Sequence, residues 1–175
     1  MTVGPQLHHL SHFDGRLLQI EKIYRKLYAA CRHAHSAIEA AIELRNRYRI
    51  NPAFISSIRI ETYGMAIRGH DHIEIKGIQS AKMSIPFSVV LALKTGSAGL
   101  GDYNERNLED EEIHRLMDMI RIVEDPEISS WLPRKRAARV TIVTTDNNSF
   151  MTCVEYPKGE PENPITESEI IEKNR

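Results

Sequence analysis

The amino-acid sequence predicts an α+β fold, a two-layer sandwich with helices packed on one face of a largely antiparallel sheet. Three observations support this prediction. Two alternating runs flank a polar turn at residues 145–148, as in a β-hairpin. Segments with helical periodicity lie between strand-like segments. Helices and strands do not alternate strictly, which argues against a parallel α/β sheet.

The size and composition are those of one domain with a hydrophobic core. The chain has 175 residues, of which 41% are hydrophobic and 27% charged, and its formal net charge is -1. This balance argues against binding of nucleic acid through bulk electrostatics. No apolar stretch is long enough to span a membrane, and residues 1–11 lack the pattern of a secretory signal. Two cysteines are too few for a disulfide framework. We therefore expect a cytoplasmic protein with reduced thiols, and neither a nucleic-acid nor a membrane partner.

The first half of the chain predicts a leader, a helix and a strand. Residues 1–16 are expected to form a flexible leader, and the apolar residues 17–24 a strand or a short helix. Residues 32–48 carry apolar side chains at three- and four-residue steps, which predicts a helix that Asn51 and Pro52 end. Residues 55–62 alternate between apolar and polar side chains and predict a half-buried strand.

Helical periodicity returns at residues 80–95. Pro86 lies inside this run, so the helix either begins near Pro86 or kinks there, and Gly96 ends it. A third helix is predicted at 108–119, with Asn107 as its N-cap. The remaining predictions are a strand at 120–123, the hairpin strands 138–144 and 149–155, and a final helix at 166–173 that begins with a capping box.

The densest group of chemically useful side chains precedes the first good helix. Lys26, Arg32, His33 and His35 lie within ten residues. If the residues before Arg32 form a loop, these side chains converge beside a helix N-terminus, where free N–H groups favour an anion. Arg32 could then hold a carboxylate through two hydrogen bonds, and a histidine could move a proton near neutral pH. The alternative, surface cations and a core histidine, stays open.

Three other segments are weaker candidates. Residues 70–72, His-Asp-His, offer two imidazoles but no third ligand nearby, so we expect a polar loop and no metal site. Lys82 lies in the first turn of its predicted helix, which is either an anion site or a solvated helix start. The basic residues 133–136 have no aromatic platform and are expected to form a loop. Cys31 has no nucleophile motif around it and is expected to be a small buried residue.

Three motifs, in order, resemble the MmgE/PrpD family. Residues 26–40 resemble its K-x-Y-P-x-C-R-x-x-H…D-A signature, with Ala29 in place of the proline and Glu39 in place of the aspartate. Residues 81–87 are similar to its A-K-F-S-L-P-Y helix, which a glycine ends, as Gly96 does here. Residues 157–164 are similar to its P-K-G-x-P-x-N-P link. The resemblance runs from about Leu17 to the C-terminus.

The resemblance implies a small domain of a larger enzyme. The family includes 2-methylcitrate dehydratase, cis-aconitate decarboxylase and iminodisuccinate epimerase, which act on small di- and tricarboxylates without a metal cluster. Its members have an all-helical domain and a smaller α+β lid domain, with the active site between them. Residues 17–157 would form the lid-type domain, and 158–175 a linker and the start of a helix that returns to the helical domain. No cofactor is expected. The implied partners are a polycarboxylate substrate and a separate helical half or a second copy, since family members are commonly dimers.

The resemblance also assigns roles to residues. Lys26 and His35 would be catalytic, whereas Arg32, His33 and Lys82 would bind substrate. Lys26 stands at the position of an active-site lysine of the decarboxylase branch, and His35, Arg32 and Lys82 match motif residues.

Two positions depart from the decarboxylase branch. Cys31 stands where that branch has an active-site histidine, and Ile67 near where it has an active-site tyrosine. The role of that histidine is therefore not carried over to Cys31, and the departure at Ile67 argues against decarboxylation. Two further hypotheses stay open, a non-catalytic remnant that acts as a binding or assembly module, and a truncated gene product without a role of its own.

Overall fold

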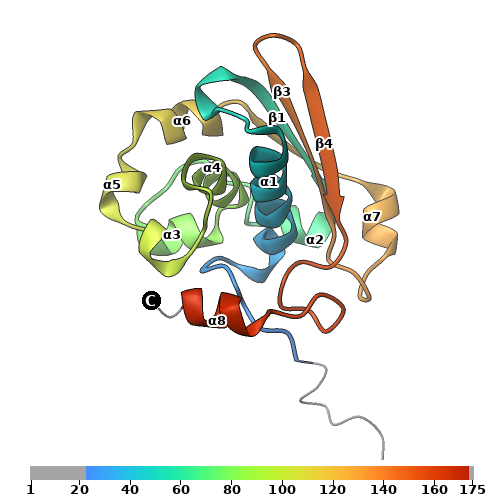
Figure 1. The fold of residues 1–175 in the computed structure, drawn as a ribbon. Helices are drawn as coiled ribbons and strands as arrows, with labels where there is room; N and C mark the ends of the chain where they lie inside the picture. Colours follow the sequence, from blue (N-terminus) through green and yellow to red (C-terminus); the bar gives the residue numbers. More distant parts are fainter. Residues whose placement is uncertain (1–22, 174–175) are drawn as a thin grey trace, which may run out of the picture.

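A computed structural model describes residues 23–173 and confirms the α+β prediction (Figure 1). Four strands form one sheet: β1 (Ile55–Thr62), β2 (Ile120–Glu124), β3 (Ala138–Thr144) and β4 (Ser149–Val154). Their order is β2-β1-β3-β4. The pairs β1–β3 and β3–β4 are antiparallel, whereas β1 and β2 are parallel. The sheet is therefore largely antiparallel with one parallel edge pair. The predicted leader, residues 1–16, and residues 17–22 of the predicted segment 17–24 lie outside the described residues.

One face of the sheet forms the core with two long helices. In β3, Ala138, Val140 and Ile142 are buried and alternate with half-buried residues. This face packs against α1 (His35–Tyr48), which lies beside α4 (Ile85–Thr95) (Figure 1). Both helices are mostly buried, and burial of each large aliphatic side chain stabilises the fold by about 1.5–3 kcal/mol. The two-layer arrangement follows from these two apolar surfaces.

The predicted helix at 80–95 is two helices, α3 (Ile78–Met83) and α4, separated by Ser84. The buried hydroxyl of Ser84 accepts a hydrogen bond from Phe87 N (3.1 Å) and donates one to His72 O (2.7 Å). Pro86 stands in the first turn of α4, where a missing N–H is harmless, so the helix begins there rather than kinking. Gly96 ends α4 with a φ of 81°, a conformation that glycine adopts readily.

The prediction of one helix at 108–119 with Asn107 as its cap is wrong. Residues 105–117 form two short helices, α5 (Glu105–Leu108) and α6 (Glu111–Met117). The carboxylate of Asp110 caps α6 by accepting hydrogen bonds from Glu112 N (3.0 Å) and Ile113 N (3.1 Å). Asn104 caps α5 in the same way, through Asn107 N. A third capped helix, α7 (Pro126–Ser130), was not predicted and begins after Asp125. The cap side chains decide these boundaries because they satisfy free N–H groups.

The remaining elements are short. They are α2 (Gly64–Ile67), α8 (Glu167–Lys173) and the 3₁₀ turns η3 (Arg32–Ala34), η4 (Pro52–Phe54) and η5 (Leu100–Asp102). The predicted capping box of α8 is confirmed, because Thr166 N donates to Glu169 Oε2 (2.8 Å) and Glu169 N to Thr166 Oγ1 (3.3 Å). Across residues 23–173, no helix combines the length and apolar character needed to cross a membrane.

The first described residues lie beside the segment that leads into α8 (Figure 1). Arg25 N donates to Gly159 O at 2.8 Å. Gly159 has a φ of 96°, and a Cβ there would lie 1.7 Å from Arg25 O. Glycine is therefore required by both the backbone conformation and the close approach. The segment 158–163, which leads toward α8, is thus fixed against the segment around Arg25.

The role of Ser84 gives a stability prediction. Ser84→Ala removes the cap of α4 and leaves His72 O without its donor, so it should lower the free energy of unfolding by about 1–2 kcal/mol. Urea unfolding measures the change. Ser149→Ala, at an exposed serine, is the control and should stay within about 0.5 kcal/mol of the wild type. Equal effects of the two substitutions would contradict the assigned role.

Candidate functional site

The predicted site lies on a non-helical segment, residues 23–31, that leads into η3 and α1. Backbone hydrogen bonds hold this segment against distant parts of the chain. Ala29 N donates to Ala98 O (2.9 Å), and Cys31 N donates to Lys82 O (2.7 Å). The loop-to-helix junction that the sequence predicted is therefore present, and neighbouring loops fix its position.

Arg32 is the buried cation of this junction. Its side chain is 9% exposed, and Nη2 forms an ion pair with Glu160. The guanidinium also stacks 4.7 Å from the ring centroid of Tyr24. Within residues 23–173, neither Nε nor Nη1 has a hydrogen-bond acceptor. Buried donors nearly always have a partner, so these two N–H groups are unsatisfied among the described residues.

Lys26 and His35, the predicted catalytic pair, meet at one backbone carbonyl. Lys26 Nζ donates to Ala30 O at 3.3 Å, and His35 Nε2 lies 3.4 Å from the same oxygen. His35 is fully buried and its ring contacts Tyr28 edge-on at 5.3 Å, whereas Lys26 is exposed. The structure thus places the ammonium at the surface and the imidazole beneath it.

Lys82 contacts the junction through its backbone. Its carbonyl accepts the hydrogen bond from Cys31 N, while its ammonium lies 5.9 Å from the ring centroid of Tyr103. The segment α3 therefore supports the junction from one side. The substrate-binding role predicted for the Lys82 side chain stays a prediction.

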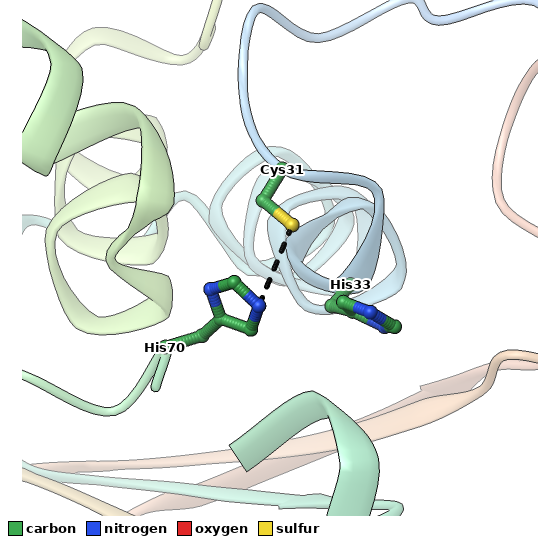
Figure 2. A group of neighbouring side chains, drawn as sticks. All are labelled: Cys31, His33 and His70. Atoms are coloured by element: carbon green, nitrogen blue, oxygen red, sulfur yellow. Dashed lines mark hydrogen bonds between the residues drawn. The ribbon is translucent and has the colours of Figure 1, made fainter. Parts of the chain in front are cut away.

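His33 belongs to a second group of side chains (Figure 2). His33 Nδ1 lies 2.7 Å from the hydroxyl of Tyr63, and its ring centroid lies 5.3 Å from that of His70. His70 Nε2 lies 3.8 Å from Cys31 Sγ. We call Cys31, His33 and His70 the thiol–imidazole cluster. One possible ligand atom from each lies within 4.8 Å of the others.

The surroundings of His33 favour the neutral form of its imidazole, and the phenol of Tyr63 beside it is neutral as well. Burial lowers the pKa of His33, and the nearby charges of His70, Arg136 and Arg32 lower it further. Burial raises the pKa of Tyr63 to about 12, so its hydroxyl stays protonated at neutral pH. At neutral pH His33 is therefore a neutral imidazole beside a neutral phenol.

Sequence reasoning missed this cluster. Cys31 was expected to be buried, but it is half-buried, and its sulfur points toward His70 (Figure 2). His70 was grouped with His72, whose Nε2 instead lies 3.2 Å from Ser80 O. The Cys-x-His spacing at residues 31–33 was the available signal. Its third member comes from a loop 39 residues after Cys31, a separation that spacing alone does not bridge.

Glu39 links α1 to the segment 158–163. Its carboxylate accepts hydrogen bonds from Lys158 N (2.5 Å) and Asn163 Nδ2 (3.3 Å). Burial nevertheless raises the pKa of Glu39 above its ordinary 4.5, against the opposing effect of these two donors. This carboxyl and the Arg32–Glu160 ion pair hold the same segment in place.

The raised pKa of Glu39 predicts a pH dependence. The folded chain holds the proton of the Glu39 carboxyl more tightly than the unfolded chain does. The resulting contribution to the free energy of unfolding is fully present below the pKa of Glu39 in the unfolded chain. It is lost as the pH rises through the folded pKa. The glutamine of Glu39→Gln cannot titrate. The free energy of unfolding of this variant should therefore increase relative to that of the wild type as the pH rises through this range. Urea unfolding at a series of pH values measures the difference, with exposed Glu105→Gln as control. A constant difference for Glu39→Gln would contradict the prediction.

The sequence of this chain is similar to one family model and to several curated proteins. Residues 28–175 match the family model of the MmgE/PrpD C-terminal domain. The chain is 30% identical over 150 residues to 2-methylcitrate dehydratase of Cupriavidus necator, covering 80% of this chain and 31% of the relative. It is 29% identical over 160 residues to cis-aconitate decarboxylase of Aspergillus terreus, covering 86% and 32%. The 2-methylcitrate dehydratase of Escherichia coli strain K12 is 27% identical over 154 residues, covering 83% and 32%.

The chain spans about a third of the length of these curated relatives. The match begins at Tyr28, just before the junction that carries Arg32 and His35, and extends through the segment that supplies Glu160. The matched region therefore contains Arg32, His33, His35 and Lys82, whereas Lys26 lies two residues before it. The chain belongs to the MmgE/PrpD family, and residues 28–175 correspond to the C-terminal domain of that family.

Proposed function

We propose that this chain is the small domain of a lyase or isomerase that acts on small di- or tricarboxylates, completed by a separate helical partner. The observation that carries the proposal is the family match over residues 28–175, in a chain that spans about a third of its relatives. The relatives are named for 2-methylcitrate and cis-aconitate, which are both tricarboxylates. A dehydratase resembling 2-methylcitrate dehydratase is the specific form of the proposal.

The buried guanidinium of Arg32 supports carboxylate binding. Its Nε and Nη1 N–H groups have no acceptor within residues 23–173, and each could donate a hydrogen bond to a carboxylate oxygen. Each hydrogen bond to a charged group contributes about 1.5–3 kcal/mol. Lys82 and His33 flank the junction and are proposed to contact the rest of the substrate.

The proposed chemistry begins with loss of a proton from the carbon next to a carboxylate. The electron pair of the broken C–H bond then spreads into an enolate, whose negative charge Lys26 and Arg32 stabilise. In dehydration this electron pair forms the double bond, while a C–O bond breaks and water leaves with the added proton. His35 is proposed to orient the junction or to relay a proton. The base that removes the first proton is assigned to the helical partner.

A second candidate function is a non-catalytic binding or assembly module. The ion pair between Arg32 and Glu160 favours it, because an internal carboxylate already holds Nη2. A module of this kind would bind a partner or a carboxylate without turnover. The two predictions that follow separate the candidates.

The chain alone should have no measurable lyase or isomerase activity. Half a cleft cannot exclude water or hold both the acid and the base. Adding a helical domain prepared from the Cupriavidus necator relative should produce turnover of 2-methylcitrate. Lys26→Ala should then lower kcat about 10²-fold, the typical effect of removing one charge-stabilising donor.

The control for this assay is Lys76→Ala, at an exposed lysine outside the junction, which should leave kcat unchanged. Turnover by the lone chain, abolished by Lys26→Ala, would contradict the need for a partner. Absence of turnover with the helical domain, for 2-methylcitrate and other di- and tricarboxylates, would favour the binding module.

Carboxylate binding should depend on Arg32 and compete with Glu160. Isothermal titration of the chain with tricarballylate should give weak binding that falls as salt is added, since partly exposed charges are screened. Arg32→Gln should abolish it, whereas Glu160→Gln should strengthen it, because the guanidinium loses its internal partner. Arg32→Lys tests the geometry, and loss of binding in this variant indicates two-point contact. Arg121→Gln, at an exposed arginine, is the control. Equal loss in Arg32→Gln and Arg121→Gln would contradict the assignment.

A further inference from the structure

The thiol–imidazole cluster brings together three side chains that bind transition metals. One ligand atom from each of Cys31, His33 and His70 lies within 4.8 Å of the others, and Cys31 Sγ lies 3.8 Å from His70 Nε2. Ligands around a tetrahedral zinc ion lie about 3.5 Å apart, given Zn–S and Zn–N bonds of about 2.3 and 2.0–2.1 Å. The observed spacing therefore needs only small side-chain shifts to reach that geometry.

Each imidazole has a second contact that fixes its orientation. His70 Nδ1 lies 3.0 Å from Met83 O, a pure acceptor, so Nδ1 carries the proton and Nε2 keeps its lone pair toward Cys31. His33 Nδ1 lies 2.7 Å from the hydroxyl of Tyr63. Metal-binding histidines characteristically donate the other ring N–H to such a partner.

The backbone also holds the ligands in place. Cys31 N donates to Lys82 O (2.7 Å), and the carbonyl of His70 accepts from Ile85 N (2.8 Å). Both contacts are to the α3–α4 region, so two loops far apart in sequence are fixed to the same support. The cluster is thus positioned before any ion binds, which lowers the cost of ordering the ligands.

We propose that Cys31, His33 and His70 form a binding site for a zinc-like divalent cation. A thiolate and two imidazoles select zinc or cobalt over magnesium or calcium, which prefer oxygen ligands. The thiolate offsets part of the ion's charge beside Arg32 and Arg136. Three protein ligands leave one tetrahedral position for water or another small ligand. The site goes beyond the carboxylate chemistry proposed above, shares only His33 with it and does not depend on it.

Cobalt titration tests the site directly. Co²⁺ added to the reduced chain should give one equivalent of binding, with visible bands of tetrahedral cobalt and a thiolate-to-cobalt charge-transfer band in the near ultraviolet. Excess Zn²⁺ should remove these bands, and Mg²⁺ should not. Cys31→Ser should abolish the charge-transfer band, and His70→Gln should lower the affinity at least tenfold. The matched controls, Cys153→Ser and His72→Gln, should retain both.

Tyr63→Phe tests the contact behind His33. It removes the hydroxyl while keeping the buried ring, and loss of such a contact lowers metal affinity about tenfold. Binding of Co²⁺ without a charge-transfer band, or a band that persists in Cys31→Ser, would overturn the proposal. So would equal affinity in wild type and His70→Gln.

Thiol alkylation tests the same site without any substitution. The chain has two free cysteines, half-buried Cys31 and exposed Cys153. Zn²⁺ should slow alkylation of Cys31 by iodoacetamide more than tenfold, because a coordinated thiolate is shielded, and should leave Cys153 unchanged. Mass spectrometry reads both residues in one sample. An unchanged rate at Cys31 in saturating Zn²⁺ would overturn the proposal.

Discussion

The guanidinium of Arg32 is almost completely buried and forms an ion pair with Glu160. Glu160 lies near the other end of the described chain. Removing one partner of a buried ion pair typically costs about 3–5 kcal/mol, because the remaining charge stays buried without compensation. The segment 158–163 must therefore return to the start of α1. Its contacts with Glu39 and Arg25 hold it there.

This constraint also places the chemically active side chains. Arg32 lies in the single turn η3, so fixing it fixes Cys31 and His33 on either side. Lys82 O and Ala98 O hold the preceding residues from the α3–α4 side of the domain. Lys26 and His35 then meet at Ala30 O, while His33 faces Tyr63 and His70. One junction thus carries both the proposed carboxylate site and the proposed metal site.

Elements defined by local periodicity were predictable from sequence. The strand at 55–62 was predicted with its observed bounds, and the hairpin nearly so, because alternation and turn residues are local signals. The split at Asp110 and the helix after Asp125 were missed, since each depends on one cap side chain within a polar run. The parallel pairing of β1 with β2 depends on packing across the helices between them, which no local pattern encodes. At the site, sequence placed Arg32 and His35 at a helix start, but it identified neither Glu160 as the partner of Arg32 nor His70 as a neighbour of Cys31 and His33.

The state of the Arg32 guanidinium in solution tests the account most directly. Nuclear magnetic resonance resolves arginine Nε–H signals, and Arg32→Lys identifies the signal of Arg32 by its disappearance. Titration with tricarballylate at low salt should shift that signal to saturation, together with the amides of residues 30–34, and leave exposed Arg121 in place. A stationary Arg32 signal, with exposed arginines shifting instead and without saturation, would contradict a carboxylate site at this junction.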